Sequence, residues 1–289
     1  SDPKAAASGA LAANHPNEPP MEGEEPKPAK RSLSAITKRA IFREVVLAKV
    51  REMKEDEKRE QVEEMFDSIA PAYDFMNSAM TFGLHRYWRN CAIKMLKSLP
   101  HDAILDVATG TGDVAFCLYD KFRPKSIVGI DLSNGMLNIA RKKLASMSHE
   151  AQKSICFKQE NCLDLSFDDK KFDLITVAYG VRNFERLAKG YAEMFRVLKP
   201  GGTLCVIELS VPKNPLIKWA YNLYSRHLIP TIGRMVSGDS RAYSYLPESI
   251  AACPQREDMT TLMSQAGFTD CRYHSLTFGT LTIYLATRP

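Results

Sequence analysis

The stretch that decides the fold is AILDVATGTGD, at residues 103–113. A short apolar run ends at Asp106, and a loop of small residues follows. In this loop Gly110 and Gly112 allow a tight turn and a close approach of the backbone to a ligand. A second apolar run, SIVGI, ends in Asp131, about 20 residues after the loop. This order of strand, glycine loop, helix, strand and acid predicts a nucleoside-binding βαβ unit, with Asp131 placed to bind a ribose diol.

The glycine loop alone is ambiguous, because the segment from Gly110 to Ala115 also fits the dinucleotide pattern G-x-G-x-x-A. Two acids disfavour a pyrophosphate. Asp106 precedes the first glycine by four residues, and Asp113 opens the helix whose positive N-terminal end would receive the phosphates. The loop better suits a ligand with a cationic centre and no phosphate, such as S-adenosylmethionine. A nicotinamide-dependent dehydrogenase is the alternative.

Composition excludes several classes of protein. The chain has 289 residues and a formal net charge of +5, with acids and bases mixed along it, so we expect no nucleic-acid partner. No apolar run approaches the ~18 residues of a transmembrane helix. The seven cysteines are scattered without a C-x-x-C pair, which predicts reduced core residues of a cytoplasmic protein and no metal site.

The two ends of the chain differ in character. Residues 1–33 are rich in Ala, Pro, Glu and Lys, which predicts a disordered tail, and its acids argue against a transit peptide. Residues 34–60 predict a charged helical extension with a thin apolar face. We interpret that face as a solvated or docking surface, with a membrane or homodimer contact as the alternative. Residues 61–289 are expected to form the catalytic domain.

Apolar segments alternate with helical ones through this domain. Because the apolar runs are continuous, they predict a parallel sheet that is buried on both faces by helices. The expected strands are 103–108, 126–131, 154–160, 172–179 and 202–209. The expected helices are 113–122, 133–147, 186–198 and 255–266, and Ser133 is expected to cap the second of them. The last two runs, 269–276 and 280–287, predict a closing antiparallel hairpin.

This order of elements, with the word LKPGG at 198–202, resembles the class I, Rossmann-like methyltransferases. Longer words narrow the resemblance to the ubiquinone/menaquinone biosynthesis C-methyltransferase family. They are MFDSIAPAYDFMN (65–77), FGLHRYWR (82–89), LDVATGTGD (105–113), YGVRNF (179–184) and SYLPESI (244–250). The resemblance implies an α/β fold with a mostly parallel seven-stranded sheet, a closing antiparallel hairpin and helices on both faces.

The resemblance also implies S-adenosyl-L-methionine as the cofactor. Asp131 is implied to bind the ribose, while Asn161 and Cys162 resemble the pair beside the adenine. Ala178 stands where many relatives have a serine that contacts the cofactor. The full set of implied cofactor contacts is Asp106, Gly110, Thr111, Gly112, Asp131, Leu132, Asn161, Cys162 and Ala178.

The reaction that the resemblance implies is C-methylation of a polyprenyl quinol ring. A naphthoquinol (demethylmenaquinol) is the favoured acceptor, and a benzoquinol of ubiquinone biosynthesis is the alternative. The implied catalytic residues are Arg182, Tyr73 and Asn183. Arg182 is interpreted as stabilising a ring phenolate, or else as a structural salt bridge. Tyr73 is either a lid residue over the reacting groups or ordinary packing, and Asn183 either contacts substrate or caps a helix.

The general base is left open by the sequence. His85 and His227 titrate in the right range, although a histidine beside Arg or Trp is more often structural. Glu248, in the turn after Pro247, is a weaker candidate that we interpret as a structural pairing residue.

An insertion at 211–252 combines basic and aromatic residues over an apolar helix. The span between Pro212 and Tyr245 has five basic residues and a single acid: Lys213, Lys218, Arg226, Arg234, Arg241 and Asp239. Interleaved with them are Trp219, Tyr221, Tyr224, Tyr243 and Tyr245. This pattern predicts peripheral contact with an anionic membrane surface, where a polyprenyl quinol resides. A helical cap over the site without a lipid role is the alternative.

Overall fold

The computed structural model describes residues 56–228, 231 and 241–289. The chain divides into two compact units, Ser1–Val50 and Arg51–Pro289. Only the second unit contains described residues, and all that follows concerns it.

The expected tail at 1–33 and most of the expected extension at 34–60 lie outside the described residues. A helix occupies residues 56–69, so the boundary expected at residue 61 falls inside a helix. This helix leads directly into a short 3₁₀ turn, η1 (Ala70–Ala72), and then into the domain.

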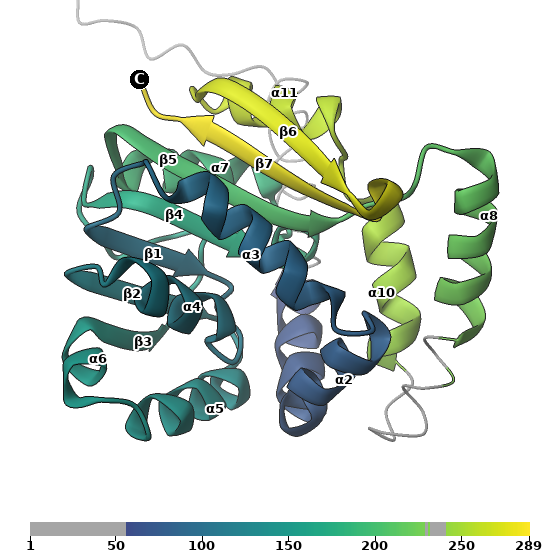
Figure 1. The fold of residues 1–289 in the computed structure, drawn as a ribbon, viewed down its shortest axis with the longest axis horizontal. Helices are drawn as coiled ribbons and strands as arrows, with labels where there is room; N and C mark the ends of the chain where they lie inside the picture. Colours follow the sequence, from purple (N-terminus) through teal and green to yellow (C-terminus); the bar gives the residue numbers. More distant parts are fainter. Residues whose placement is uncertain (1–55, 229–230, 232–240) are drawn as a thin grey trace, which may run out of the picture. The chain divides into compact units, whose positions relative to one another are not determined.

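Seven strands form one sheet in the order β3-β2-β1-β4-β5-β7-β6 (Figure 1). The first five strands run parallel, and β7 is antiparallel to both β5 and β6. This confirms the expected fold class and the closing hairpin. The strands are β1 (Ala103–Val107), β2 (Ser126–Asp131), β3 (Ile155–Gln159), β4 (Phe172–Ala178), β5 (Leu198–Leu209), β6 (Thr269–Leu276) and β7 (Leu281–Thr287).

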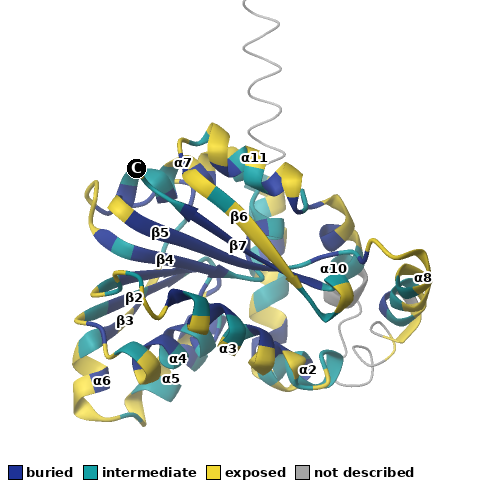
Figure 2. Cartoon of the chain, turned by 45° about the horizontal axis from the view of Figure 1, so that its top comes forward, coloured by how far each residue is buried: buried dark blue, intermediate teal, exposed yellow. Residues whose placement is uncertain are grey.

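Helices cover both faces of the sheet, and each face has its own apolar cluster. On one face α3, α4 and α5 pack on the strands, and on the other α7 and α11 do so. The central strands β4 and β5 are buried over most of their length (Figure 2). The helices are α2 (Tyr73–Met80), α3 (Leu84–Leu96), α4 (Asp113–Phe122), α5 (Asn134–Ala145), α6 (His149–Ser154), α7 (Leu187–Val197), α8 (Pro215–Leu223), α10 (Arg241–Ala252) and α11 (Glu257–Gln265).

Two details differ from the sequence-based expectation. The short helix α6 was not expected, because its six residues are mostly polar; it is capped by Ser148, whose hydroxyl accepts from Ala151 N. Strand β5 begins at Leu198, so the Pro-Gly-Gly segment lies within the strand and does not precede it. The expected cap of α5 is confirmed, since the Ser133 hydroxyl accepts a hydrogen bond from Met136 N.

The sheet edge at the carboxyl ends of the strands has unusual backbone geometry. Ala108, after β1, has φ of 53° and Tyr179, after β4, has φ of 58°, a left-handed conformation that costs energy for residues other than glycine. A Cβ on Gly180 would lie only 2.5 Å from the Ala108 Cβ, so the two loops touch where only glycine fits. These loops are packed tightly against each other and have fixed conformations.

The insertion at 211–252 is mostly helical where the structure describes it, from Pro215 onward. It contains α8, a π-helical turn (Tyr224–Leu228) and α10. In Figure 1, α8 and α10 lie with α2 beyond the carboxyl ends of the parallel strands. Among the described residues, no helix is both long and apolar enough to cross a bilayer, and no cluster of His, Cys, Asp and Glu could hold a metal.

Candidate active site

Three pockets meet at the carboxyl edge of the sheet, and Tyr73 and Tyr179 line all three of them. Tyr73 is the first residue of α2, and Tyr179 follows β4. Because the two tyrosines lie far apart in the sequence, the site is assembled only on folding. A group that sits between them has access to all three pockets.

The first pocket lies at the end of β2 and contains most of the expected cofactor residues. Asp131 is at its centre: one carboxylate oxygen accepts from Gly110 N at 2.8 Å and the other from Ser133 N at 2.9 Å. Burial raises the pKa of Asp131 to about 6. The other expected residues that line this pocket are Gly110, Leu132, Asn161, Cys162, Ala178 and Asn183.

Asp106 occupies a different environment. Its carboxylate is 1% exposed and accepts hydrogen bonds from the hydroxyls of Thr109 at 2.6 Å and Thr176 at 2.5 Å. Burial raises the pKa of Asp106 to about 6, although both hydroxyls oppose that rise. Asp106 therefore holds the glycine loop onto β4, and it lines a second, polar pocket and not the one that contains Asp131.

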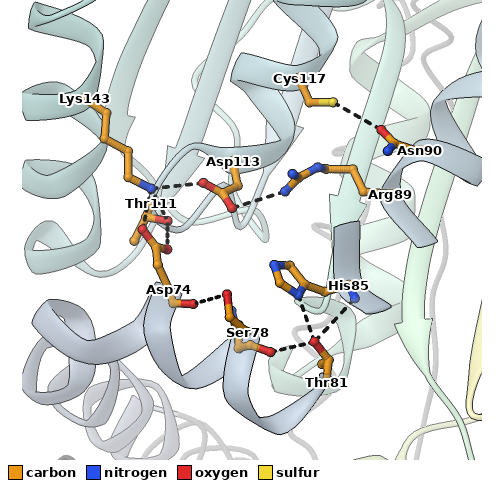
Figure 3. Close-up of polar contacts among 11 residues, drawn as sticks. Asp74, Ser78, Thr81, His85, Arg89, Asn90, Thr111, Asp113, Cys117 and Lys143 are labelled. Carbon is orange, nitrogen blue, oxygen red and sulfur yellow. Dashed lines mark hydrogen bonds and ion pairs between the residues drawn. The ribbon is translucent and has the colours of Figure 1, made fainter. Parts of the chain in front are cut away.

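The polar pocket is surrounded by charged groups from four elements (Figure 3). Thr111 donates to Asp74 Oδ1 at 2.6 Å, and Lys143 Nζ lies 2.5 Å from Asp74 Oδ2 and 3.0 Å from Asp113 Oδ1. Arg89 Nη1 lies 3.2 Å from Asp113 Oδ2. The Thr111 hydroxyl, expected at the cofactor, is thus engaged by α2. Gly112 lines none of the three pockets; its missing Cβ leaves room for two phenylalanine rings.

The third pocket is an apolar cavity of about 260 Å³. It lies between α2, α3, α8 and α10. Its walls are mainly aromatic and aliphatic side chains. Apart from tyrosines, the titratable side chains in the walls are Arg182 and His85. The lining from the insertion is Tyr221, Tyr224, Tyr245, Leu246 and Ile250.

Arg182 forms the structural salt bridge that was one of its two expected roles, and it also lines the apolar cavity. Its Nη1 lies 2.8 Å from Glu208 Oε1 and also donates to the Tyr179 carbonyl, so the structural salt bridge exists. Its Nε is nevertheless buried without a partner, and the side chain lines the apolar cavity. Burial alone would lower the pKa of Arg182, but Glu208 and Tyr73 outweigh this effect and raise the pKa above its ordinary value. The guanidinium therefore stays charged.

The remaining candidates separate clearly. Asn183 does not cap α7, whose N-terminus has no side-chain cap; its Oδ1 accepts from Tyr245 Oη at 3.2 Å. His85 is buried and lines both the apolar cavity and the polar pocket. His227 and Glu248 are exposed and line none of the three pockets.

Three residues at the site were not identified from the sequence. Tyr179 Oη and Glu160 Oε2 are buried without a hydrogen-bond partner, and each lines the pocket that contains Asp131. Glu208, near the end of β5, fixes Arg182. Buried polar atoms are rarely left unpaired, so these two free atoms fit hydrogen bonds to a polar ligand such as a nucleoside. The only sequence signal for them was their position just after a strand.

A family model described as the ubiE/COQ5 methyltransferase family matches residues 52–288. The chain belongs to this family. Membership confirms the expected S-adenosylmethionine-dependent methyltransferase and overturns the dehydrogenase alternative.

Curated relatives match over most of their length. A demethylmenaquinone methyltransferase of Bacteroides fragilis is 47% identical over 231 residues, which are 80% of this chain and 94% of the relative. One of Porphyromonas gingivalis is 44% identical, with the same 80% and 94% covered. A ubiquinone/menaquinone biosynthesis C-methyltransferase of Geotalea daltonii is 42% identical and covers 79% of this chain and 96% of its own.

Solved structures share the fold at low identity. A SAM-dependent methyltransferase of Thermotoga maritima aligns with a TM-score of 0.53 and 18% identity, covering 78% of this chain and 99% of that one. A phosphoethanolamine N-methyltransferase of Haemonchus contortus, bound to S-adenosyl-L-methionine, gives 0.51 and 15%, covering 69% and 52%. These alignments support the Rossmann-like architecture.

The environment of Asp131 predicts that cofactor affinity depends on pH. A carboxylate accepts ribose hydroxyls, whereas its protonated form accepts them poorly, so binding is full above the pKa and is lost below it. With the pKa at about 6, the dissociation constant for S-adenosylmethionine should rise ~10-fold between pH 7 and pH 5 by titration calorimetry.

Two variants control this measurement. Asp131→Asn should bind ~10- to 100-fold more weakly at pH 7 and lose the pH dependence. Asp106→Asn should keep the dependence, because the Asp106 oxygens are engaged by Thr109 and Thr176 and Asp106 does not line the pocket that contains Asp131. A pH-dependent affinity that survives in Asp131→Asn would contradict the assignment.

Proposed function

We propose that this protein methylates a ring carbon of a reduced polyprenyl quinol, most specifically demethylmenaquinol, in menaquinone biosynthesis. One observation carries the proposal: an apolar cavity of about 260 Å³ opens onto a nucleoside-type pocket at Tyr73 and Tyr179, with Arg182 in the cavity wall. The relatives from B. fragilis and P. gingivalis are demethylmenaquinone methyltransferases, which supports the naphthoquinol. The G. daltonii relative carries a name for both quinones, so a benzoquinol is the second candidate.

The residues of the first pocket fit the adenosine part of S-adenosylmethionine. Asp131 would accept from the ribose hydroxyls, and Asn161 and Cys162 would border the adenine. The adjoining polar pocket, which shares Gly110 with the first, would take the charged amino-acid end, because it offers Arg89 and three carboxylates, those of Asp74, Asp106 and Asp113. When bound, the cofactor supplies an electrophilic methyl group.

The protein's own contribution to the chemistry is to keep the quinol ring away from water and to favour its electron-rich, ionised form. The apolar walls exclude water from the quinol head, and a ring hydroxyl that ionises pushes electron density onto the neighbouring carbon. Arg182 Nε–H, buried and unpartnered, can donate to that oxygen as charge develops. Glu208 fixes the guanidinium, so the donor is already in place when substrate binds.

The helix at 56–69 and α2 pack against the glycine loop and the start of α5 and cover the site. Asp67, on the helix at 56–69, accepts from Ser133 Oγ at 2.5 Å and from Gly135 N at 2.8 Å. Asp74 holds Thr111 in the same way. These contacts place Tyr73 between the cofactor and quinol pockets, which supports its role as a lid residue over the reacting groups.

The function is tested by methyl transfer from labelled S-adenosylmethionine to short-chain quinols under reducing conditions. We expect product with demethylmenaquinol, less with the matching benzoquinol, and none with either oxidised quinone, since only the quinol ring is electron-rich. No transfer to either quinol would overturn the proposal.

Arg182 should act on turnover more than on cofactor affinity. Because Arg182 lines the apolar cavity and not the pocket that contains Asp131, Arg182→Ala should lower kcat ~100-fold or more, with the dissociation constant of S-adenosylmethionine within about threefold of wild type. Glu208→Gln should lower kcat less, as it keeps the arginine. Equal losses of kcat and cofactor affinity in Arg182→Ala would assign the arginine a purely structural role.

Peripheral membrane contact follows from the outward face of α8. Leu216, Trp219 and Leu223 are 75%, 65% and 53% exposed and share one face at i, i+3 and i+7 spacing. The opposite face points Tyr221 into the quinol cavity. Phe82, 75% exposed, also lines that cavity. An apolar rim around the entrance of a cavity for a membrane-resident substrate fits the lipid surface.

Vesicle binding tests this contact. Leu216→Ser combined with Trp219→Ser should lower binding to anionic vesicles ~10-fold, since two exposed apolar anchors are lost. Added salt should weaken wild-type binding, because the insertion is rich in basic residues. Tyr273→Ser, at an exposed aromatic of β6, is the control and should bind as wild type. Wild-type protein that fails to co-sediment at low salt would remove the membrane role.

A further inference from the structure

The general base of the reaction can be assigned from a hydrogen-bond chain at the junction of α2 and α3 (Figure 3). Thr81 Oγ1 donates to the carbonyl of Asn77 at 2.6 Å, which uses its one proton. The same oxygen lies 2.8 Å from His85 Nδ1. With its proton already committed, Thr81 can only accept from the ring, so Nδ1 carries the hydrogen.

This contact fixes the tautomer of His85. If Nδ1 carries the hydrogen, Nε2 presents a lone pair, and among the described residues no group is hydrogen-bonded to it. The ring edge with Nε2 faces away from Thr81 (Figure 3). His85 lines both the apolar cavity and the polar pocket, so the residue lies where these two pockets adjoin.

We propose that His85 Nε2 accepts the hydroxyl proton of the quinol during methyl transfer, with Thr81 as the residue that positions it. This proposal rests on the proposed function. The quinol O–H bond breaks and an Nε2–H bond forms. The freed electron pair moves through the ring into the new carbon–carbon bond to the methyl group, whose bond to sulfur breaks.

The second half of the reaction restores the base. The methylated carbon still holds its ring hydrogen, which is lost as a proton to solvent when the product leaves the cavity and the ring regains aromaticity. The imidazolium returns its proton to the ring oxygen, so one proton is released overall. Arg182 holds the oxygen during the interval in which the proton is on His85.

The surroundings keep His85 neutral and ready to accept. Burial lowers the pKa of His85, and Arg89 and Arg86 on its own helix lower it further, while Asp113 of α4 and Asp74 of α2 oppose them. The other titratable or charged groups that line the apolar cavity are Arg182 and five tyrosines: Tyr73, Tyr179, Tyr221, Tyr224 and Tyr245. At pH 7 the imidazole is therefore unprotonated, and it loses its basic form only in acid.

The decisive variant is His85→Asn, whose amide nitrogen replaces Nδ1 and keeps the bond to Thr81 but removes Nε2. We expect kcat to fall ~100-fold or more, with little change in KM for the quinol or in cofactor affinity, and the acid limb of the kcat profile to disappear. His149→Asn, at an exposed position on α6, should match wild type. Wild-type kcat, or an unchanged acid limb, in His85→Asn would overturn the proposal.

Thr81 gives an independent test that keeps the histidine. Thr81→Val removes the acceptor for Nδ1–H and should lower kcat, whereas Thr81→Ser should restore it. In the protein without substrate, ¹⁵N NMR of the imidazole should show a protonated Nδ1 and an unprotonated Nε2 at pH 7. The opposite tautomer would refute the assignment. If the wild type transferred methyl to no quinol, the proposed function would be refuted. The NMR measurement would still determine the tautomer of His85.

Discussion

The site depends on one carboxylate, Asp131, that joins two loops. It accepts from Gly110 N with one oxygen and from Ser133 N with the other, so the loop after β1 and the turn after β2 are held at a fixed separation. Without this bridge the backbone amide of Gly110 would lose its hydrogen-bond partner at the sheet edge. The same group is partly desolvated, which makes it a strong acceptor for hydroxyls that replace water.

The other parts of the site are arranged around that bridge. Asp106 fastens the loop to β4 through Thr176, and Asp74 and Asp67 fasten the N-terminal helices to it from outside. Each of these carboxylates accepts from a hydroxyl or an amide of a different element. The aromatic groups, Tyr73 and Tyr179, then lie where the elements converge. In the proposed function, carboxylates therefore organise the side of the methyl donor, and aromatic, arginine and histidine groups form the side of the acceptor.

Much of the fold was predictable, because buried parallel strands leave continuous apolar runs and their order determines the sheet. The loop glycines and Asp131 were predictable by their positions after strands. Arg182 was predicted through the resemblance, but its partner Glu208 was not, since the pair joins residues on β5 and after β4 that only the sheet register brings together. Tyr179 and Glu160 were missed because an unpaired buried atom is a property of three-dimensional packing. The histidine tautomer likewise depends on Thr81 and Asn77, whose bonds no sequence pattern encodes.

The cavity for the acceptor is built almost entirely from helices outside the sheet: α2, α3, α8 and α10. The nucleoside pocket is built mainly from loops at the strand ends. Substitutions on these helices can therefore reshape the apolar cavity while leaving most of the nucleoside pocket unchanged. A lineage that changes its quinone has only to exchange side chains on peripheral helices, and the strained, tightly packed corner at Tyr179 and Gly180 can be inherited unaltered.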